Sequence, residues 1–445
     1  MRTSAMAALL CLSFSAAAAA AAQDIPSFVN SETPALVDTY KDIHEHPELS
    51  HFEARTSHIL AEALRAAGYT VTERVGRYPD GSQAYGVVGI LKNGAGPTLM
   101  IRADMDALPI VEETGVPYAS HVTMKDLAGQ TVGVMHACGH DVHTTVMIGT
   151  ARAMVAIKSE WHGTLMLVGQ PSEETIDGAK AMLADHLYER FGRPDRIIGL
   201  HDTSFLAAGT VGVRSGPSAA SSTSIDVVIR GIGGHGAAPN AGRDPVTLAA
   251  LYITQIQTIV SREEDPQDPT VVTVGHIEGG TKRNIIPDEV KLELTTRSFS
   301  DKSRATVIKG LEQMAAGITA SAGLPPEKAA TVTVLENEST PVLYNDPAQT
   351  SMVKATLVKT LGADNVSDIP RAMASEDVGV FALPNHEIPL TYFILGAMDP
   401  VKLTAARAAG KELPGPHTNR FEPLPEPTIR TGVTAMTSVA ISLLQ

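Results

Sequence analysis

The sequence predicts an α/β domain that is interrupted by a smaller α+β domain. Three observations lead to this prediction. Apolar strands alternate with helical segments through the first half of the chain, acidic or imidazole side chains follow several of those strands, and the pattern changes between residues 218 and 338 before the first one resumes. A chain of 445 residues is long enough for about two or three such units.

The composition excludes several classes of protein. Charged residues make up 19% and hydrophobic residues 43% of the chain, which is ordinary for a globular protein and excludes a disordered chain or a coiled coil. The net charge of -14 argues against nucleic acid or an anionic membrane surface as a partner. The charge balance instead favours solubility.

The first 22 residues have the pattern of a secretory signal peptide. Arg2 provides a positive start, an apolar run follows from Ala5, and the alanines at 20–22 fit a cleavage site before Gln23. We expect export to the periplasm or the exterior, with no membrane contact after cleavage. Cleavage removes Cys11 and leaves Cys138, which alone cannot form an intrachain disulfide.

The first part of the main domain is expected at 23–217. Helical patterns occur at 34–43, 53–67 and 144–157, and strand patterns at 85–91, 98–103, 163–169 and 196–200. The strand at 98–103 is apolar until Arg102, which is typical of strands covered on both faces.

Polar side chains follow three of these strands. They are Asp104 and Asp106 after the second strand, Glu173 and Glu174 after the third, and His201 after the fourth. Because α/β sheets place their active sites at the carboxyl ends of the strands, we expect these groups to meet at one edge.

The interrupting domain is expected at 218–338, and the second part of the main domain at 339–445. The inserted segment has strand patterns at 224–230, 271–275, 290–297 and 330–335 and helical patterns at 245–261 and 305–320. A four-stranded sheet with two helices on one face fits this order. The last part has a helix at 347–361, a strand at 391–395, a loop holding His417 and a helix at 428–444.

The stretch 135–143 has the chemistry of a metal site. It contains one thiol, three imidazoles and one carboxylate, on Cys138, His136, His140, His143 and Asp141. Thiolate and imidazole are ligands of zinc and its first-row neighbours, and the Cys-x-His spacing lets two side chains converge from one turn. The alternative is a helix start that happens to be rich in histidine.

The role open to the Glu173-Glu174 pair depends on whether its backbone forms a strand or a turn. Adjacent residues of a strand face opposite ways. In a turn, one carboxylate can bind a metal while its neighbour faces the water that the metal activates, which is the place of a general base. A solvated acidic loop is the alternative interpretation.

Seven motifs follow one another along nearly all of the mature chain. They are RADMDALP at 102–109, HACGHD at 136–141, QPSEE at 170–174, GLH at 199–201, GGHGA at 233–237, NIIPD at 284–288 and SED at 375–377. Together they resemble the M20 family of metallopeptidases, and more narrowly its aminoacylase, hippurate hydrolase and auxin-conjugate amidohydrolase branch. The resemblance implies an α/β catalytic domain with a two-metal site at the carboxyl edge of its strands, interrupted by a lid and dimerisation domain.

The resemblance also implies the residues of the metal site. The ligands would be Cys138, His140, Glu174, His201 and His417. Cys138 would bridge or cap two divalent ions, with Glu173 as the general base. Manganese or zinc is expected, and nickel or cobalt also suits such mixed ligands. His136 and His143 are expected to support the ligands, and Asp104 stands where other branches carry a metal-binding histidine.

Four further residues receive roles through the same resemblance. Asp106 would orient the site, and His235 would reach the tetrahedral intermediate, often across a dimer interface. Asn284 and Arg297 would hold the substrate carboxylate, because an arginine fork can bind a carboxylate at two points.

The expected activity is metal-dependent hydrolysis of the amide bond of an N-acyl amino acid or a small peptide-like amide, by a homodimer. A dipeptidase or carboxypeptidase on the same scaffold is the nearest alternative. A binding protein without hydrolysis and a hydrolase that uses Cys138 as nucleophile belong to other classes. Chelator treatment separates the last from a metal enzyme, because a thiol enzyme should survive it.

Overall fold

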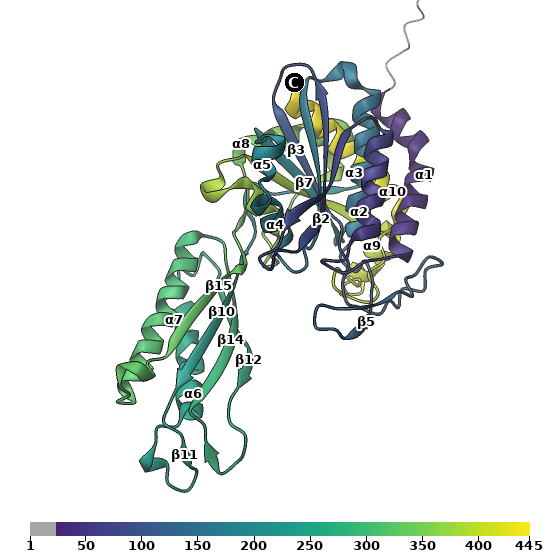
Figure 1. Cartoon of the computed structure of the whole chain (residues 1–445). Helices are drawn as coiled ribbons and strands as arrows, with labels where there is room; N and C mark the ends of the chain where they lie inside the picture. The colour runs from purple at the N-terminus through teal and green to yellow at the C-terminus, as the bar shows by residue number, and fades with distance from the viewer. Residues whose placement is uncertain (1–23) are drawn as a thin grey trace, which may run out of the picture.

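The computed structural model describes residues 24–445, so the predicted signal peptide and Cys11 lie outside the described residues. Two sheets organise this part of the chain: an eight-stranded sheet flanked by helices, and a four-stranded sheet with two helices that extends away from it (Figure 1). Within 24–445, none of the helices combines the length and the apolar character needed to cross a bilayer.

The large sheet is mixed. Its order is β1 (Thr70–Arg77), β2 (Gln83–Asn93), β6 (Gly163–Gln170), β3 (Thr98–Asp104), β7 (Arg196–Ala207), β18 (Leu390–Met398), β8 (Val211–Val213) and β17 (Val366–Asp368). The central strands β6, β3, β7 and β18 are parallel to one another. Their carboxyl ends therefore lie at one edge, as the sequence predicts.

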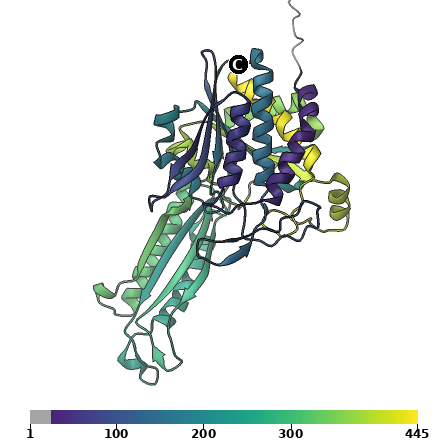
Figure 2. The ribbon, with the colours of Figure 1, turned by 45° about the vertical axis from the view of Figure 1, so that its right-hand side comes forward.

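Helices cover both faces of this sheet. One face carries α1 (Ile25–Glu45), α2 (Ala54–Ala66), α3 (His140–Ala156), α8 (Pro347–Leu361) and α10 (Pro425–Leu444). Figure 2 shows α1, α2 and α3 standing side by side on that face. The other face carries α4 (Gly178–Ala184) and α5 (Leu187–Phe191). This double cover explains why six of the seven residues of β3 are buried.

The amphipathic pattern of α1 shows how the sequence builds this layer. Leu36, Tyr40 and Ile43 recur at helical spacing, and all three are fully buried or nearly so. Burial of each such side chain contributes about 1.5–3 kcal/mol. The helix begins at Ile25 and is capped by Asp24, whose side chain accepts a hydrogen bond from the backbone N–H of Ser27 at 2.8 Å.

The small sheet is antiparallel throughout. Its order is β12 (Val271–Glu278), β14 (Glu289–Ser298), β10 (Ser221–Arg230) and β15 (Thr331–Thr340), with α6 (Pro245–Thr258) and α7 (Asp301–Ser321) packed on one face. The four predicted strands and two predicted helices are confirmed. Strand β14 alternates exposed and buried residues over most of its length, which is typical of a sheet with one open face.

Short elements complete the chain. They are the paired strands β4 (Thr123–Lys125) and β5 (Thr131–Gly133), β9 (Gly216–Ala219) and β16 (Leu343–Asn345), and β11 (Gly234–His235) and β13 (Ile285–Ile286), together with helix α9 (Pro400–Ala408). Strands of two to four residues leave no periodic pattern in the sequence, and none of these was predicted.

Candidate metal centre

Strands and one helix start bring the candidate ligands to the carboxyl edge of the large sheet. Strand β3 ends at Asp104, which is level with Gln170 at the end of β6. His201 lies on β7, which continues to Ala207 instead of ending at residue 200 as predicted. Helix α3 begins at His140, directly after Cys138 and Gly139.

Gly139 is required by the backbone between the two candidate ligands Cys138 and His140. Its φ is 80°, in the left-handed region that favours glycine. A Cβ at this position would lie 2.3 Å from a carboxylate oxygen of Asp202. Only glycine therefore fits between Cys138 and His140.

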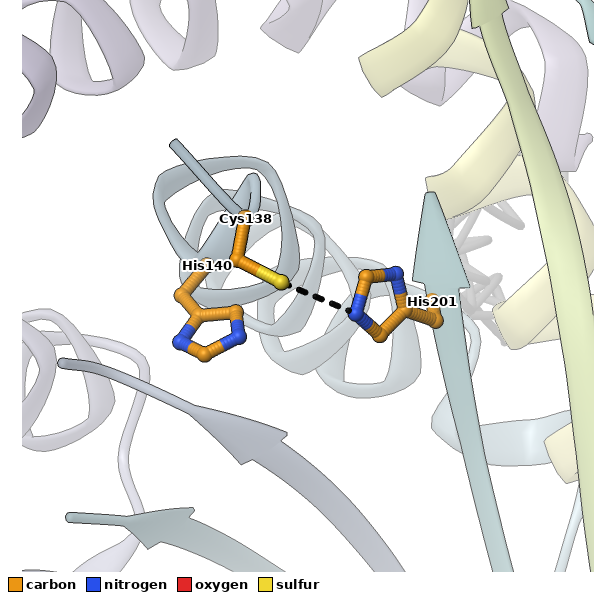
Figure 3. A group of neighbouring side chains, drawn as sticks. All are labelled: Cys138, His140 and His201. Atoms are coloured by element: carbon orange, nitrogen blue, oxygen red, sulfur yellow. Dashed lines mark hydrogen bonds between the residues drawn. The ribbon is translucent and has the colours of Figure 1, made fainter. Parts of the chain in front are cut away.

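Two groups of candidate ligands share Cys138. One contains Cys138, His140 and His201, the other Cys138, Glu174 and His417, and in each group the ligand atoms lie within 4.8 Å of one another. The Sγ atom of Cys138 is 3.4 Å from Nε2 of His201 and 3.3 Å from Nε2 of His417. Figure 3 shows the thiol of Cys138 between the rings of His140 and His201.

Glu174 joins the two groups. Its carboxylate lies 3.5 Å from Nε2 of His417 and 3.9 Å from Nε2 of His140. Glu173, the next residue, also approaches Nε2 of His140 to 3.9 Å. The structure thus brings the five predicted ligands and Glu173 together.

The donor set fits divalent metal ions. Nε2 of His140 and Oε1 of Glu174 are buried, and neither has a hydrogen-bond partner within the described residues. Burial and the nearby Glu174 raise the pKa of Cys138 well above its usual value, and burial raises the pKa of Glu174 to about 7. A cation at this place would partner the orphaned atoms and favour the thiolate, and thiolate, imidazole and carboxylate are ordinary ligands of zinc.

Asp106 holds the turn that carries both glutamates. Its carboxylate accepts hydrogen bonds from the backbone N–H groups of Glu173 at 3.1 Å and Glu174 at 3.0 Å, and from the hydroxyl of Ser50 at 2.6 Å. Its backbone carbonyl lies 2.8 Å from Nδ1 of His140. One buried residue therefore orients a candidate ligand on α3 and the turn after β6.

Glu173 faces a cavity of about 620 Å³ that Cys138, Glu174, His201 and His417 also line. Burial, together with the carboxylates of Glu376 and Glu174, raises the pKa of Glu173 well above its usual value. A carboxyl group with a raised pKa can accept a proton and return it at a pH near neutrality.

Arg297 lines the same cavity from the small sheet. Its guanidinium donates to the hydroxyls of Ser222 and Thr295 and to the backbone carbonyl of Thr296 at 3.2 Å. None of these acceptors is a carboxylate, and burial lowers the pKa of Arg297. A half-buried guanidinium so placed is suited to an anionic group of a ligand.

His235 and Asn284 lie away from this centre within the chain. Both are exposed, on or beside the short strands β11 and β13, and neither lines the cavity. Figure 1 places β11 at the end of the small sheet that is farthest from the large one. The structure of one chain therefore does not bring these two residues to the predicted ligands.

The two neighbouring histidines, His143 and His136, differ in their contacts. Nδ1 of His143 donates to Asp104 at 2.5 Å, and its Nε2 accepts from the backbone N–H of Asp202 at 3.0 Å. Both ring nitrogens are thus occupied, in agreement with a supporting role. The ring nitrogens of His136 are buried and make no hydrogen bond within residues 24–445.

A buried network beneath the cavity was not predicted. The fully buried Arg102 lies 2.8 Å from Glu376 and 2.9 Å from Asp377, and the hydroxyl of Tyr392 donates to Glu376 at 2.9 Å. Glu376 and Tyr392 both line the cavity. The signal in the sequence is the arginine itself, a charge inside an otherwise apolar strand, but its partner Asp377 is 275 residues away.

Comparison with known proteins identifies relatives that cover most of the chain. Residues 100–412 match the profile of Peptidase family M20/M25/M40. Hippurate hydrolase of Campylobacter jejuni is 35% identical over 76% of this chain and 82% of its own length, and IAA-amino acid hydrolase ILR1-like 4 of Arabidopsis thaliana is 38% identical over 79% and 76%. A solved dinuclear metal-binding peptidase of the M20 family from Bacillus subtilis has a TM-score of 0.73 and 26% identity, covering 93% of this chain and 99% of that one.

Proposed function

The chain belongs to Peptidase family M20/M25/M40, and from that premise we propose that it hydrolyses the amide bond of an N-acyl amino acid or a small peptide-like amide. Membership makes it a metal-dependent hydrolase of amide or peptide bonds. The observation that carries the narrower proposal is the cavity that holds the ligand cluster, Glu173 and the half-buried Arg297 together.

The proposed cofactor is a pair of divalent ions, manganese or zinc, with nickel or cobalt as other candidates. Cys138, His140, Glu174, His201 and His417 would hold them, and Cys138 belongs to both groups of candidate ligands. Bound divalent ions polarise a carbonyl oxygen and lower the pKa of water.

The side chains of the protein supply the remaining steps. The carboxylate of Glu173 takes a proton from the attacking water and returns it to the nitrogen of the leaving amine. Asp106 keeps that carboxylate in place through the two backbone N–H groups of the turn. Arg297 binds the carboxylate of the substrate and so fixes the scissile bond in the cavity.

Dimerisation and export belong to the proposal. Exposed Ile232 and Ile285 flank His235 and Asn284 at the far end of the small sheet, which supports a contact there with a second copy of the chain. In such a homodimer His235 and Asn284 would serve the other copy's cavity. The signal-like residues 1–22 support a periplasmic or secreted enzyme.

Replacement of each of the two adjacent glutamates by glutamine tests the roles proposed for Glu173 and Glu174. In Glu173→Gln, metal content by elemental analysis should equal that of the parent, while turnover should fall by about 10³-fold or more, because the proton acceptor is lost. In Glu174→Gln, metal content should fall as well. Parent-like turnover in Glu173→Gln would remove Glu173 from this role.

A dipeptidase or carboxypeptidase is the second candidate, favoured by the peptidase relative from Bacillus subtilis. It differs from the first in leaving group and not in mechanism. Rates on N-acyl amino acids and on dipeptides, measured with the same preparation, separate the two. Activity that survives a chelator would instead point to Cys138 as a nucleophile.

A further inference from the structure

The turn after β6 holds a strained residue next to the catalytic carboxylate. Ile176 has φ 53°, and its backbone N–H donates to the carbonyl of Glu173 at 2.7 Å. A β-branched side chain in the left-handed region is an outlier, because its Cβ crowds the backbone. Such strain persists only where the surrounding structure holds it, and it is concentrated at functional sites.

Contacts at both ends hold this turn. At the first end the carboxylate of buried Glu53 accepts from the backbone N–H of Ser172 at 2.8 Å and from its hydroxyl at 3.0 Å. At the second end Asp177 lies 3.0 Å from Nε2 of His51. Both anchors come from the loop and helix start around residues 51–53. The turn is therefore fixed independently of the side chain at position 176.

Ile176 lines the cavity. Leu343, Ile369, Pro370 and Ala372 provide further apolar lining, while Cys138, Glu174 and the histidines provide the polar part. Ile176 is the apolar lining residue on the turn that carries Glu173. A glycine would adopt this positive φ without strain, so the backbone conformation does not explain an isoleucine at this position. The place of the residue in the cavity lining does explain it.

We propose that Ile176 is a specificity-determining residue: its side chain limits the size of the substrate group that the apolar part of the cavity beside Glu173 accepts. This inference rests on the proposed function. Removal of a few carbon atoms from the wall of an apolar pocket changes discrimination by about 10-fold to 200-fold. Ile176→Gly removes both the wall and the strain, and Ile176→Ala removes the wall and keeps a Cβ at positive φ.

The test measures kcat/KM of the metal-loaded enzyme on two series: one amino acid with acetyl, isobutyryl and benzoyl groups, and one acyl group on glycine, leucine and phenylalanine. In both Ile176 variants the ratio of aromatic to small substrates should rise by about 10-fold or more in at least one series. Ile176→Gly should also melt at a higher temperature than Ile176→Ala, because it relieves the strain.

Arg74→Gly is the matched control. Arg74 also has a positive φ, 60°, but it is exposed and lies outside the cavity. This variant should keep the substrate ratios of the parent. Ratios within about twofold of the parent in both series, with metal content intact, would overturn the proposal.

Ligand binding separates this proposal from the function on which it rests. If the parent hydrolyses no member of either series, the proposed function fails, and calorimetric affinities for the same compounds then decide the role of Ile176. A rise in the aromatic-to-small affinity ratio in both Ile176 variants would still support it. An unchanged ratio, or no binding of any member, would overturn it.

Discussion

Gly139 sets the backbone geometry between two residues of the candidate metal centre. In Gly139→Ala the new Cβ would meet the Asp202 carboxylate at 2.3 Å and would also sit at φ 80°. We expect a loss of metal content and a stability loss well above the ~1–2 kcal/mol that a left-handed conformation costs a non-glycine residue. Elemental analysis and equilibrium unfolding measure the two effects.

Gly68→Ala separates the two causes. Gly68 has φ 94°, but no atom lies within 4 Å of a Cβ built there. This variant should show only the backbone cost, about 1–2 kcal/mol, with parent-like metal content. Equal losses in Gly68→Ala and Gly139→Ala would show that crowding by Asp202 is irrelevant.

Sequence reasoning reaches some residues of the site and not others. Cys138 and His140 could be predicted because thiol and imidazole chemistry is compressed into one short stretch. His417 lies in a loop with no such neighbours, and the family resemblance alone pointed to it. The strain at Ile176 depends on φ, which the sequence does not reveal.

At the scale of elements, His44 ties α1 to α3 and to the loop after β3. Its Nδ1 lies 2.6 Å from Asp141 and its Nε2 3.1 Å from Glu112, and both partners are carboxylates, which accept hydrogen bonds when ionised. Both ring nitrogens must therefore donate, so the ring is charged. Burial opposes this charge, but the hydrogen bonds to Asp141 and Glu112 prevail and raise the pKa of His44 to about 9.

This tie predicts a pH-dependent stability. Because the pKa of His44 is raised in the folded state from 6.5 to about 9, its contribution is full below pH 6.5 and is lost as the pH rises through 9. The contribution is on the order of 3 kcal/mol. The free energy of unfolding should be measured for the parent and for His44→Gln at about pH 6 and at about pH 10. The difference between the two proteins should be much larger at the lower pH.

An exposed pair provides the control for this tie. His58 lies 3.4 Å from Glu73 and its side chain is 64% exposed, so His58→Gln should change stability by no more than about 1 kcal/mol at either pH. If the free energies of unfolding of the parent and of His44→Gln differ by the same amount at both pH values, a charged His44 is contradicted.

The elements themselves were predictable where they are long and periodic. The helix at 347–361 and the strand at 98–103 agree with α8 and β3 to within one residue. Strand β7 was predicted too short, because its continuation beyond residue 200 depends on pairing with β18, almost 200 residues later. Helix α3 starts four residues before the predicted helix, because the left-handed Gly139 opens it directly at His140.

At the scale of the whole molecule, the change of pattern near residue 218 revealed the inserted sheet, but not how it contacts the rest. One such contact is made by Lys180 on α4. Its ammonium group donates to the backbone carbonyls of Glu336 and Asn337, both at 2.9 Å, and of Ser339, at the end of β15. A single lysine thus connects the helix after the turn that carries Glu173 to the small sheet that carries Arg297.

Removal of this contact should weaken substrate binding. Lys180→Met keeps most of the aliphatic stem but loses three hydrogen bonds, so the two halves of the cavity, with Glu173 on one side and Arg297 on the other, should be held less firmly. We expect KM to rise several-fold, about the effect of 1 kcal/mol, while kcat changes less, because the turn that carries Glu173 keeps its own anchors.

Lys354→Met, which removes an exposed pair with Asp368, should leave both constants at parent values. Steady-state kinetics on one N-acyl amino acid measure the difference, and equal KM values for the two variants would mean that the Lys180 contact does not position the small sheet for binding.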